Sequence, residues 1–269
     1  MTKDASDPEN LPLLLRTIES TTGFDCVNYS TSFLSRRIGV RLRAVKATTF
    51  TSYAQLLRVS PEECDRLKRE FTIHTTGFFR DLTFWRILEQ RVLPQLLSKK
   101  HGMLRIWSAG CSTGEEPLSL AIACAEVGTD LGRVSILATD LDRETIARAR
   151  TASYEEQQFR EMPSDYKAKY FAPQQNDTFS PDPALLRLIT YEQGDIISTH
   201  RRTGFDLILC RNTVIYFDAE TKRELYLTFA DCLVPDGFLV IGKTEILQGP
   251  AHDLFKIFDS KERIYQKKA

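Results

Sequence analysis

The chain of 269 residues is long enough for one large domain, or for a large domain and a small one. Hydrophobic residues make up 42% and charged residues 27% of it, a globular composition that excludes a disordered chain. Lysine plus arginine and aspartate plus glutamate both number 36, so the formal net charge is zero. No global field therefore favours nucleic acid or an anionic membrane, and an electrostatic partner must bind a local patch.

The cysteines and the first residues indicate the compartment. Six cysteines are scattered with no C-x-x-C pair and no histidine placed to complete a zinc set, so we predict neither a disulfide framework nor a metal site. The residues before Leu11 lack the apolar core of a signal peptide, and no stretch approaches the ~18 apolar residues of a membrane span. We expect a monomeric cytoplasmic protein without membrane insertion.

From Leu11 to Gln90 apolar residues recur at three and four positions, which predicts a small helix bundle. We assign residues 10–78 to a helical N-terminal domain and residues 79–269 to a second domain. One helix is expected from Thr31 to Lys46. Another is expected to begin at Ser60 and Pro61, because serine is a good N-cap and proline suits the first turn.

The helix expected over Thr31 to Lys46 is strongly basic. Between Leu11 and Lys46 the chain holds six basic and two acidic residues, and none of the acidic ones neighbours the basic residues of this helix. Such a face is either ordinary solvated surface or a docking surface for an acidic partner. Its basic residues are Arg36, Arg37, Arg41, Arg43 and Lys46.

After His101 short apolar strands alternate with helical segments, which is typical of a βαβ sheet. We predict an open, mostly parallel α/β sheet. The expected strands are Met103 to Ser108, Val134 to Ala138, Phe205 to Cys210 and Phe238 to Gly242. The expected helices are Glu116 to Val127, Arg143 to Ala149 and Ala219 to Cys232. Four prolines between Phe159 and Leu185 break the alternation and predict a small insertion at about 159–187.

Gly110 and Gly114 lie in the first strand-to-helix turn, where a doubly wound sheet binds its ligand. Their Gly-x-x-x-Gly spacing disfavours a nicotinamide cofactor, and the lack of a following Lys-Ser/Thr excludes a P-loop. Glu115 and Glu116 would repel a phosphate but suit a ligand with an ammonium or sulfonium charge. Ordinary acids at a helix start are the alternative.

Carboxylates also follow the next strands. Asp140 comes 26 residues after Gly114, near the spacing of a carboxylate that holds ribose hydroxyls, so an adenosine group without phosphates would fit. Either Asp140 or Asp142 is expected instead to cap the helix that begins at Arg143. Asp195 lies at the same expected sheet edge and could accept a hydrogen bond from an adenine amino group.

Four segments together resemble the S-adenosylmethionine-dependent chemotaxis receptor methyltransferases. They are FTIHTTGFFRD (Phe71 to Asp81), WSAGCSTGEEP (Trp107 to Pro117), ATDLD (Ala138 to Asp142) and CRNTVIYFD (Cys210 to Asp218). The resemblance spans nearly the whole chain. It implies an all-α N-terminal domain before a class I methyltransferase domain, a Rossmann-like doubly wound sheet with a small β insertion. It also implies methyl transfer from S-adenosylmethionine to glutamates of the receptor's cytoplasmic coiled coil, leaving S-adenosylhomocysteine.

The resemblance also implies the site residues. Arg80 and Tyr216 match the residues at the reacting groups. The implied cofactor contacts are His74, Thr76, Arg80, Gly110, Glu115, Asp140, Asp195, Ile196, Asn212 and Thr213. The sequence departs from the family where His74 and Asp195 each replace an asparagine, Thr213 a valine and Lys243 a histidine. A non-catalytic S-adenosylmethionine-binding signalling module is therefore the alternative. Nitrogen methylation is disfavoured because no Asn/Asp-Pro-Pro-Tyr/Phe motif follows the strand Phe205 to Cys210.

A receptor glutamate is already a carboxylate at neutral pH, so attack on the methyl group needs no general base. Arg80 is expected to hold one carboxylate oxygen, with a hydrogen bond from Tyr216. An ion pair between Arg80 and Asp81 is the plainer interpretation of that arginine. Three phenylalanines, Phe78, Phe79 and Phe217, are expected either to wall the site or to pack in the core. The basic helix would bind the glutamate-rich receptor.

Overall fold

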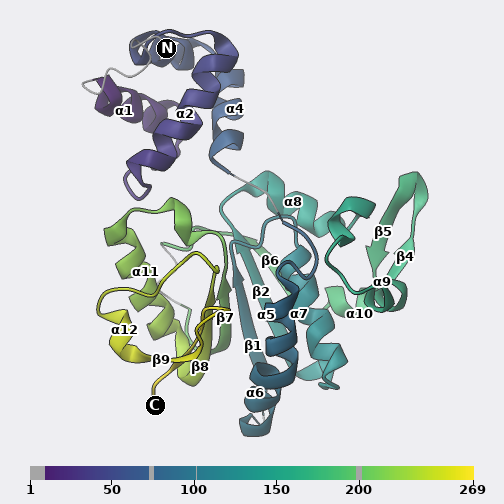
Figure 1. The fold of residues 1–269 in the computed structure, drawn as a ribbon. Coiled ribbons are helices and arrows are strands. Elements are labelled where there is room, and N and C mark those ends of the chain that lie inside the picture. Colours follow the sequence, from purple (N-terminus) through teal and green to yellow (C-terminus); the bar gives the residue numbers. More distant parts are fainter. Residues whose placement is uncertain (1–9, 73–75, 101, 198–201) are drawn as a thin grey trace. The chain divides into compact units, whose positions relative to one another are not determined.

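The computed structural model describes residues 10–72, 76–100, 102–197 and 202–269. The chain divides into two compact units (Figure 1). The helical unit comprises Met1–Ile73 together with Tyr216–Thr221, and the sheet unit comprises His74–Ile215 together with Lys222–Ala269.

The helical unit is built from α1 (Leu11–Thr22), α2 (Thr31–Val45), α3 (Phe50–Val59) and α4 (Pro61–Phe71). Serine caps begin two of these helices, since Ser30 accepts a hydrogen bond from Phe33 N–H and Ser60 from Glu63 N–H. The helices meet around side chains with no exposed surface, namely Ile18, Ile38, Tyr53 and Leu67. The helices expected over Thr31 to Lys46 and from Pro61 are confirmed.

A short segment far along the chain also belongs to the helical unit. The N–H of Ser30 donates to the Tyr216 carbonyl over 2.9 Å, and Tyr29 pairs with Phe217 in an isolated β-bridge. The Tyr216 ring centroid lies 4.9 Å from that of Phe33. Aromatic contacts therefore hold this segment against the start of α2.

The sheet unit contains a seven-stranded sheet in the order β6-β2-β1-β7-β8-β10-β9. The strands are β1 (Leu104–Ala109), β2 (Val134–Asp140), β6 (Ile189–Gln193), β7 (Phe205–Cys210), β8 (Leu233–Ile241), β9 (Phe255–Asp259) and β10 (Ile264–Lys267). The first five strands in this order run parallel, while β10 and β9 are antiparallel to their neighbours. The predicted mostly parallel sheet is confirmed.

Helices cover both faces of this sheet. They are α5 (Leu82–Ile87), α6 (Leu93–Lys99), α7 (Glu115–Glu126), α8 (Arg143–Thr151), α11 (Ala219–Cys232) and α12 (Ala251–Leu254), and a π-helical turn (Leu88–Val92) joins α5 to α6. Helices α5, α6 and α7 lie against one face (Figure 1). On the other face Trp107 packs edge-on against Phe229 of α11. No helix of the described ranges is both long and apolar enough to cross a membrane.

The helical pattern that continues to Gln90 includes residues that pack in two different hydrophobic cores. Phe84, Trp85 and Leu88 are at most 1% exposed and pack in the core of the sheet unit, not in the helical unit. The segment assigned to the helix bundle, Leu11 to Gln90, was therefore too long. Periodicity identifies the buried face of a helix but not the core that covers it.

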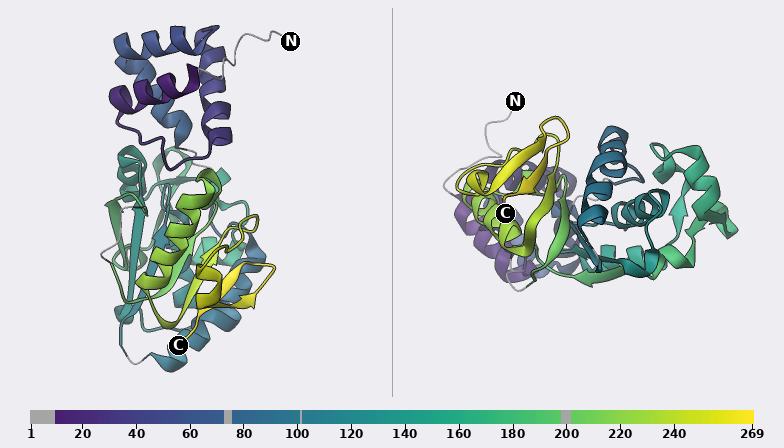
Figure 2. Two further views of the ribbon diagram at one scale, coloured as in Figure 1. Left: turned by 90° about the vertical axis from the view of Figure 1, so that its left-hand side faces the viewer. Right: turned by 90° about the horizontal axis from the view of Figure 1, so that it is seen from below.

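The interruption between α8 and β6 forms a small antiparallel sheet in the order β3-β5-β4. Its elements are β3 (Tyr154–Glu155), α9 (Ser164–Tyr170), β4 (Phe171–Pro173), β5 (Thr178–Pro181) and α10 (Pro183–Leu186). It lies at the β6 end of the main sheet, opposite the end that carries β9 (Figure 2). The predicted small β insertion is thus part of the sheet unit.

All six cysteines are buried, and none forms a disulfide. Burial raises the pKa of the Cys26 and Cys124 thiols to about 12 and that of Cys232 to about 11. At neutral pH these side chains are therefore protonated thiols that pack as small apolar groups.

Candidate functional site

The carboxyl ends of four neighbouring strands meet at one edge of the sheet. These strands, β6, β2, β1 and β7, are parallel. Asp140 is the last residue of β2, and Asp195, Gly110 and Asn212 lie in the loops after β6, β1 and β7. A hydrogen bond from Gly194 N–H to the Asp140 carbonyl, 3.0 Å long, joins two of these ends. Residues far apart in the sequence are thus gathered where an open α/β sheet binds its ligand.

The loop after β1 has the geometry of a ligand cradle. Gly110 has φ +88°, and a Cβ there would approach Thr213 Oγ1 more closely than van der Waals contact allows. The backbone N–H of Ser112 donates to Asp140 Oδ2 over 2.9 Å. The Ser112 hydroxyl is buried and has no hydrogen-bond partner among the described residues. A close-approach glycine beside an unsatisfied buried hydroxyl fits a polar ligand such as a nucleoside.

Asp140 and Asp142 have different roles. Asp140 binds the glycine loop, whereas the Asp142 side chain accepts hydrogen bonds from Glu144 N–H, at 2.8 Å, and from Thr145 Oγ1, at 3.0 Å. Asp142 is therefore the cap of α8, which confirms that one of the two carboxylates caps this helix. Asp140 remains the predicted ribose ligand.

Glu115 begins α7 but has no exposed surface. Its carboxylate accepts hydrogen bonds from Thr113 Oγ1, at 2.8 and 2.9 Å, and from Gln158 Nε2 of the insertion. Burial raises the pKa of Glu115, while these hydrogen bonds favour its charged form. A carboxylate held in this way next to the glycine loop is suited to a cationic ligand group.

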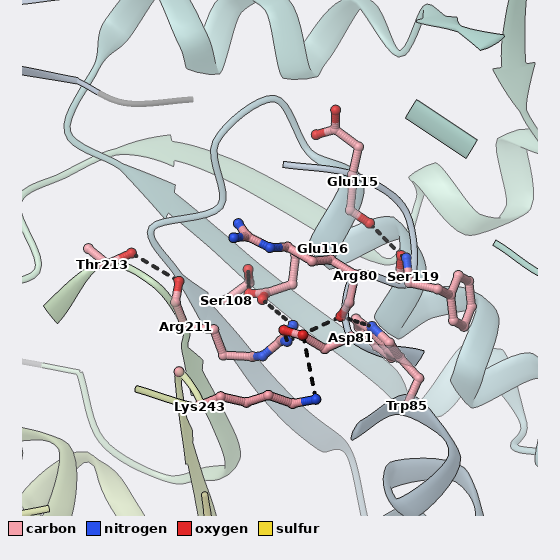
Figure 3. A network of polar contacts seen from close by, with 12 residues as sticks. Arg80, Asp81, Trp85, Ser108, Glu115, Glu116, Ser119, Arg211, Thr213 and Lys243 are labelled. Atoms are coloured by element: carbon pink, nitrogen blue, oxygen red, sulfur yellow. Dashed lines mark hydrogen bonds and ion pairs between the residues drawn. The ribbon is translucent and has the colours of Figure 1, made fainter. Parts of the chain in front are cut away.

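A network of buried charges surrounds the turn that carries Arg80 (Figure 3). Arg211 Nη2 donates to the Arg80 carbonyl over 3.1 Å and to Asp81 Oδ2 over 2.6 Å. Its Nη1 lies 3.5 Å from Glu116 Oε2, and Glu116 also accepts from Ser108 Oγ over 2.7 Å. Sequence reasoning missed Arg211, although it stands in the CRN segment beside a predicted cofactor contact.

The backbone of this turn is strained. Phe79 and Asp81 have φ values of +52° and +65°, although neither is glycine. Hydrogen bonds hold the conformation from several elements. Phe79 N–H donates to Ser119 Oγ over 3.1 Å, and Trp85 Nε1 donates to the Arg80 carbonyl over 3.0 Å.

Lys243, which departs from the family pattern, also contacts this turn. Its Nζ lies 3.5 Å from Asp81 Oδ1 and 3.2 Å from Glu262 Oε2, and it donates to Thr83 Oγ1 over 3.1 Å. Because the lysine side chain is 40% exposed, solvent screens these ion pairs. Asp81 is thus bound by Arg211 and Lys243 together.

The predicted phenylalanine walls are core residues. Phe78 and Phe79 are at most 1% exposed, with Phe78 stacked on Phe159 of the insertion and Phe79 packed against Trp85. The core-packing interpretation is confirmed for both. Phe217 is 4% exposed and packs on Tyr29 within the helical unit.

The remaining predicted cofactor contacts have these positions. His74 lies outside the described residues, and Thr76 is half-buried directly before the Arg80 turn. Asp195 accepts from Ile197 N–H over 2.9 Å, and Ile196 is buried. Asn212 has φ +59° in the loop after β7, beside Thr213. Tyr216 belongs to the helical unit.

Two residues of the basic helix have acidic partners, which corrects the sequence interpretation. Arg37 Nη1 lies 2.9 Å from Glu70 Oε1. Arg41 donates to both oxygens of the buried Glu63, over 3.0 and 2.7 Å. These partners come from α4, so they are neighbours in space but not in sequence. Arg37 and Arg41 therefore join α2 to α4 instead of facing solvent.

The other three basic residues are exposed: Arg36 and Arg43 on α2, and Lys46 at its C-cap. Arg36 and Arg43 are seven positions apart, so they share one side of α2, whereas Lys46 caps the end of the helix with φ +56°. No ion pair links them to any described residue. We call these three residues the α2 basic face.

Glu245 joins the loops after β7 and β8. Its carboxylate accepts hydrogen bonds from Gly242 N–H, at 2.5 Å, and from Ile215 N–H, at 3.1 Å. The residue is 5% exposed, and burial raises its pKa to about 7, against the effect of these hydrogen bonds.

We expect Glu245 to make folding stability fall as the pH rises from about 4.5 to about 7. The folded protein holds this proton more tightly than the unfolded chain, so stability is lost as the group ionises. The loss is at most about 3 kcal/mol. Denaturant unfolding at several pH values should show a smaller pH dependence for Glu245→Gln than for the wild type. Equal pH dependence in both proteins would contradict this role.

Two family models match the chain. The model described as "CheR methyltransferase, SAM binding domain" matches residues 74–264, and "CheR methyltransferase, all-alpha domain" matches residues 9–72. SAM is S-adenosylmethionine, whose adenosine and cationic methionine fit the glycine loop and the buried Glu115 described above. S-adenosylmethionine is therefore the cofactor.

Curated relatives agree with these models. A "Chemotaxis protein methyltransferase" of Listeria innocua is 36% identical over 88% of this chain and 89% of its own length. A protein of the same description from Borreliella burgdorferi is 29% identical over 90% of this chain and 89% of its own length. Because the family models together cover both units and the Listeria relative is aligned over most of both chains, this chain belongs to the CheR family of S-adenosylmethionine-dependent chemotaxis methyltransferases.

Proposed function

We propose that this methyltransferase esterifies glutamate side chains in the cytoplasmic coiled coil of a chemotaxis receptor. The observation that carries the proposal is the turn around Arg80. A strained backbone is held there by Ser119, Trp85 and Arg211, at the sheet edge that also bears the glycine loop. An arginine whose backbone is held at this edge of the sheet is suited to orienting a carboxylate.

The proposed reaction requires orientation and little proton transfer. Bound S-adenosylmethionine supplies a methyl group on a sulfonium, an electrophile that a carboxylate attacks directly. Arg80 binds one oxygen of the glutamate and leaves the other to react. Tyr216 remains the predicted second hydrogen-bond donor. Because the reactants' opposite charges vanish in the transition state, the buried surroundings of Glu116 favour the reaction by excluding water.

The function is tested by transfer of label from methyl-labelled S-adenosylmethionine to receptor-containing membranes, followed by mild alkali. We expect a base-labile label that is released as methanol, since a glutamate methyl ester hydrolyses in alkali. A label that resists alkali would contradict carboxyl methylation. Calorimetric binding of the cofactor without label on any of several receptors would favour the non-catalytic signalling module.

We further propose that the α2 basic face steers the enzyme to its receptor. Receptor segments around methylated glutamates are acidic, and a positive surface raises the rate of encounter with them. Arg37 and Arg41 are paired with acidic residues of α4, so the proposal rests on Arg36, Arg43 and Lys46.

Reversing two charges on this face should slow methylation at low salt. We expect the Arg36→Glu/Arg43→Glu variant to lose about tenfold in kcat/KM for the receptor, with cofactor affinity unchanged, and to approach the wild type as salt screens the attraction. Initial rates over a salt series measure this. The matched control is Arg58→Glu, an exposed arginine of α3. Equal rates for the double variant and this control at low salt would exclude the steering role.

A further inference from the structure

We infer that Arg211 is a positioning residue for Arg80. The inference rests on the proposed function, because it assumes that Arg80 binds the glutamate carboxylate. Arg211 itself is expected to touch neither substrate nor cofactor. Its task is to fix the backbone from which the Arg80 side chain extends.

The contacts of Arg211 converge on that backbone. Its side chain is only 4% exposed, and one nitrogen, Nη2, binds both the Arg80 carbonyl and the Asp81 carboxylate. The guanidinium also lies over the Phe84 ring, 4.4 Å from its centroid. One planar cation thus joins three points of the turn and of the helix that follows it. In Figure 3 the Arg80 carbonyl faces Arg211 and Trp85, while its side chain extends in another direction.

Arg211 also balances the charges around Arg80. Burial raises the pKa of Glu116, and Arg211 and then Arg80 are among the groups that oppose this shift by favouring its charged form. Asp81 carries a second negative charge directly after Arg80. By binding both carboxylates, Arg211 weakens their electrostatic hold on the Arg80 guanidinium. Less electrostatic free energy is then lost when the Arg80 guanidinium leaves these carboxylates to bind the substrate carboxylate.

The strain of the turn makes this support necessary. Positive φ values are unfavourable at Phe79 and Asp81, so the turn persists only where the surrounding contacts hold it. Arg211, which directly follows β7, supplies two of the contacts that hold the turn, to the Arg80 carbonyl and to Asp81. A lysine at this position keeps the charge but has only one nitrogen, so it cannot bind the carbonyl and Asp81 through one nitrogen while a second lies near Glu116.

A kinetic cycle with Arg80 tests the inference. We expect Arg211→Lys to lower kcat by about 100-fold, the cost of misplacing a reacting group by about 1 Å, with little change in the dissociation constant of S-adenosylmethionine. In an Arg80→Ala background the same substitution should change kcat less than about threefold, since its effect passes through Arg80. An equal factor in both backgrounds would show that Arg211 acts independently and would overturn the inference.

A second readout needs neither substrate nor cofactor. The chain has two tryptophans, and Trp85 Nε1 shares the Arg80 carbonyl with Arg211. Nitrogen–proton correlation spectra of the free protein resolve the two indole signals, and Trp107→Phe assigns them. We expect Arg211→Lys and Arg211→Met to shift the Trp85 signal. An unshifted signal in both folded variants would contradict the placement of the carbonyl by Arg211.

Arg91 provides the matched control. Its guanidinium lies 4.6 Å from the Phe258 ring centroid and 3.6 Å from Asp259 Oδ2, so it has the same kinds of partner away from the Arg80 turn. Arg91→Lys should leave kcat and the Trp85 signal unchanged. If wild-type protein forms no base-labile ester, the proposed function fails, and the indole shift still decides whether Arg211 fixes the turn.

Discussion

Replacing Arg80 with alanine should lower the rate of receptor methylation by about 100- to 1,000-fold, the usual effect of removing one preorganised electrostatic contact. The variant keeps its backbone contacts to Arg211 and Trp85, because both bind the Arg80 carbonyl. The fold is therefore expected to survive. The measurement is the initial rate of base-labile ester formation at saturating S-adenosylmethionine.

Two further measurements separate the roles expected of Arg80. Calorimetry gives the cofactor affinity of Arg80→Ala, since Arg80 is also a predicted cofactor contact. Arg80→Lys keeps the charge but not the planar fork, so its rate should lie between the wild type and Arg80→Ala. A wild-type rate in the alanine variant would remove Arg80 from the reaction and favour the plainer interpretation as a structural cation.

Replacing Gly114 with alanine should destabilise the sheet unit by about 2–6 kcal/mol, the sum of a positive-φ penalty and overpacking. Gly114 has φ +98°, and a Cβ there would lie 2.8 Å from the Tyr191 hydroxyl and 2.9 Å from that of Tyr154. Both rings are buried, so neither hydroxyl can move away freely. Thermal melting should show a midpoint lower by about 5–15 °C.

The Tyr191→Phe substitution provides the control for Gly114. It removes one of the two hydroxyl groups from the position of the new Cβ, so the Gly114→Ala/Tyr191→Phe protein should recover part of the lost stability. Cofactor affinity should follow the same order, because Gly114 ends the ligand loop. A Gly114→Ala protein that melts with the wild type would contradict this account of the glycine.

The sequence predicted most of the sheet and its functional edge. Short apolar runs identify β1, β2 and β7 because parallel strands buried on both faces are almost continuously hydrophobic. The carboxyl ends of parallel strands lie at the same edge of the sheet. Because Gly110, Asp140 and Asn212 lie at the carboxyl ends of such strands, the topology of the sheet brings them together. Asp142 was also predictable as a cap, since capping is a local interaction.

Contacts between distant segments could not be predicted in this way. Arg41 and Glu63 are separated by 22 residues, and Arg211 and Asp81 by 130, so no local pattern indicates either pair. The sequence also did not predict that Glu115 is buried, or that the helical pattern continues beyond the bundle, for the same reason. Each depends on which elements pack together, and helix or strand periodicity carries no information on that choice.

The burial of every cysteine makes the native chain a convenient background for chemical labelling. Alkylating reagents attack the thiolate; all six native thiols are buried, and burial also raises the pKa of Cys26, Cys124 and Cys232. A single cysteine introduced at an exposed position such as Val59, which is 78% exposed, would therefore accept a fluorophore while the six native cysteines stay in place. Slow labelling of the unmodified chain would in turn report the rate at which its cores open.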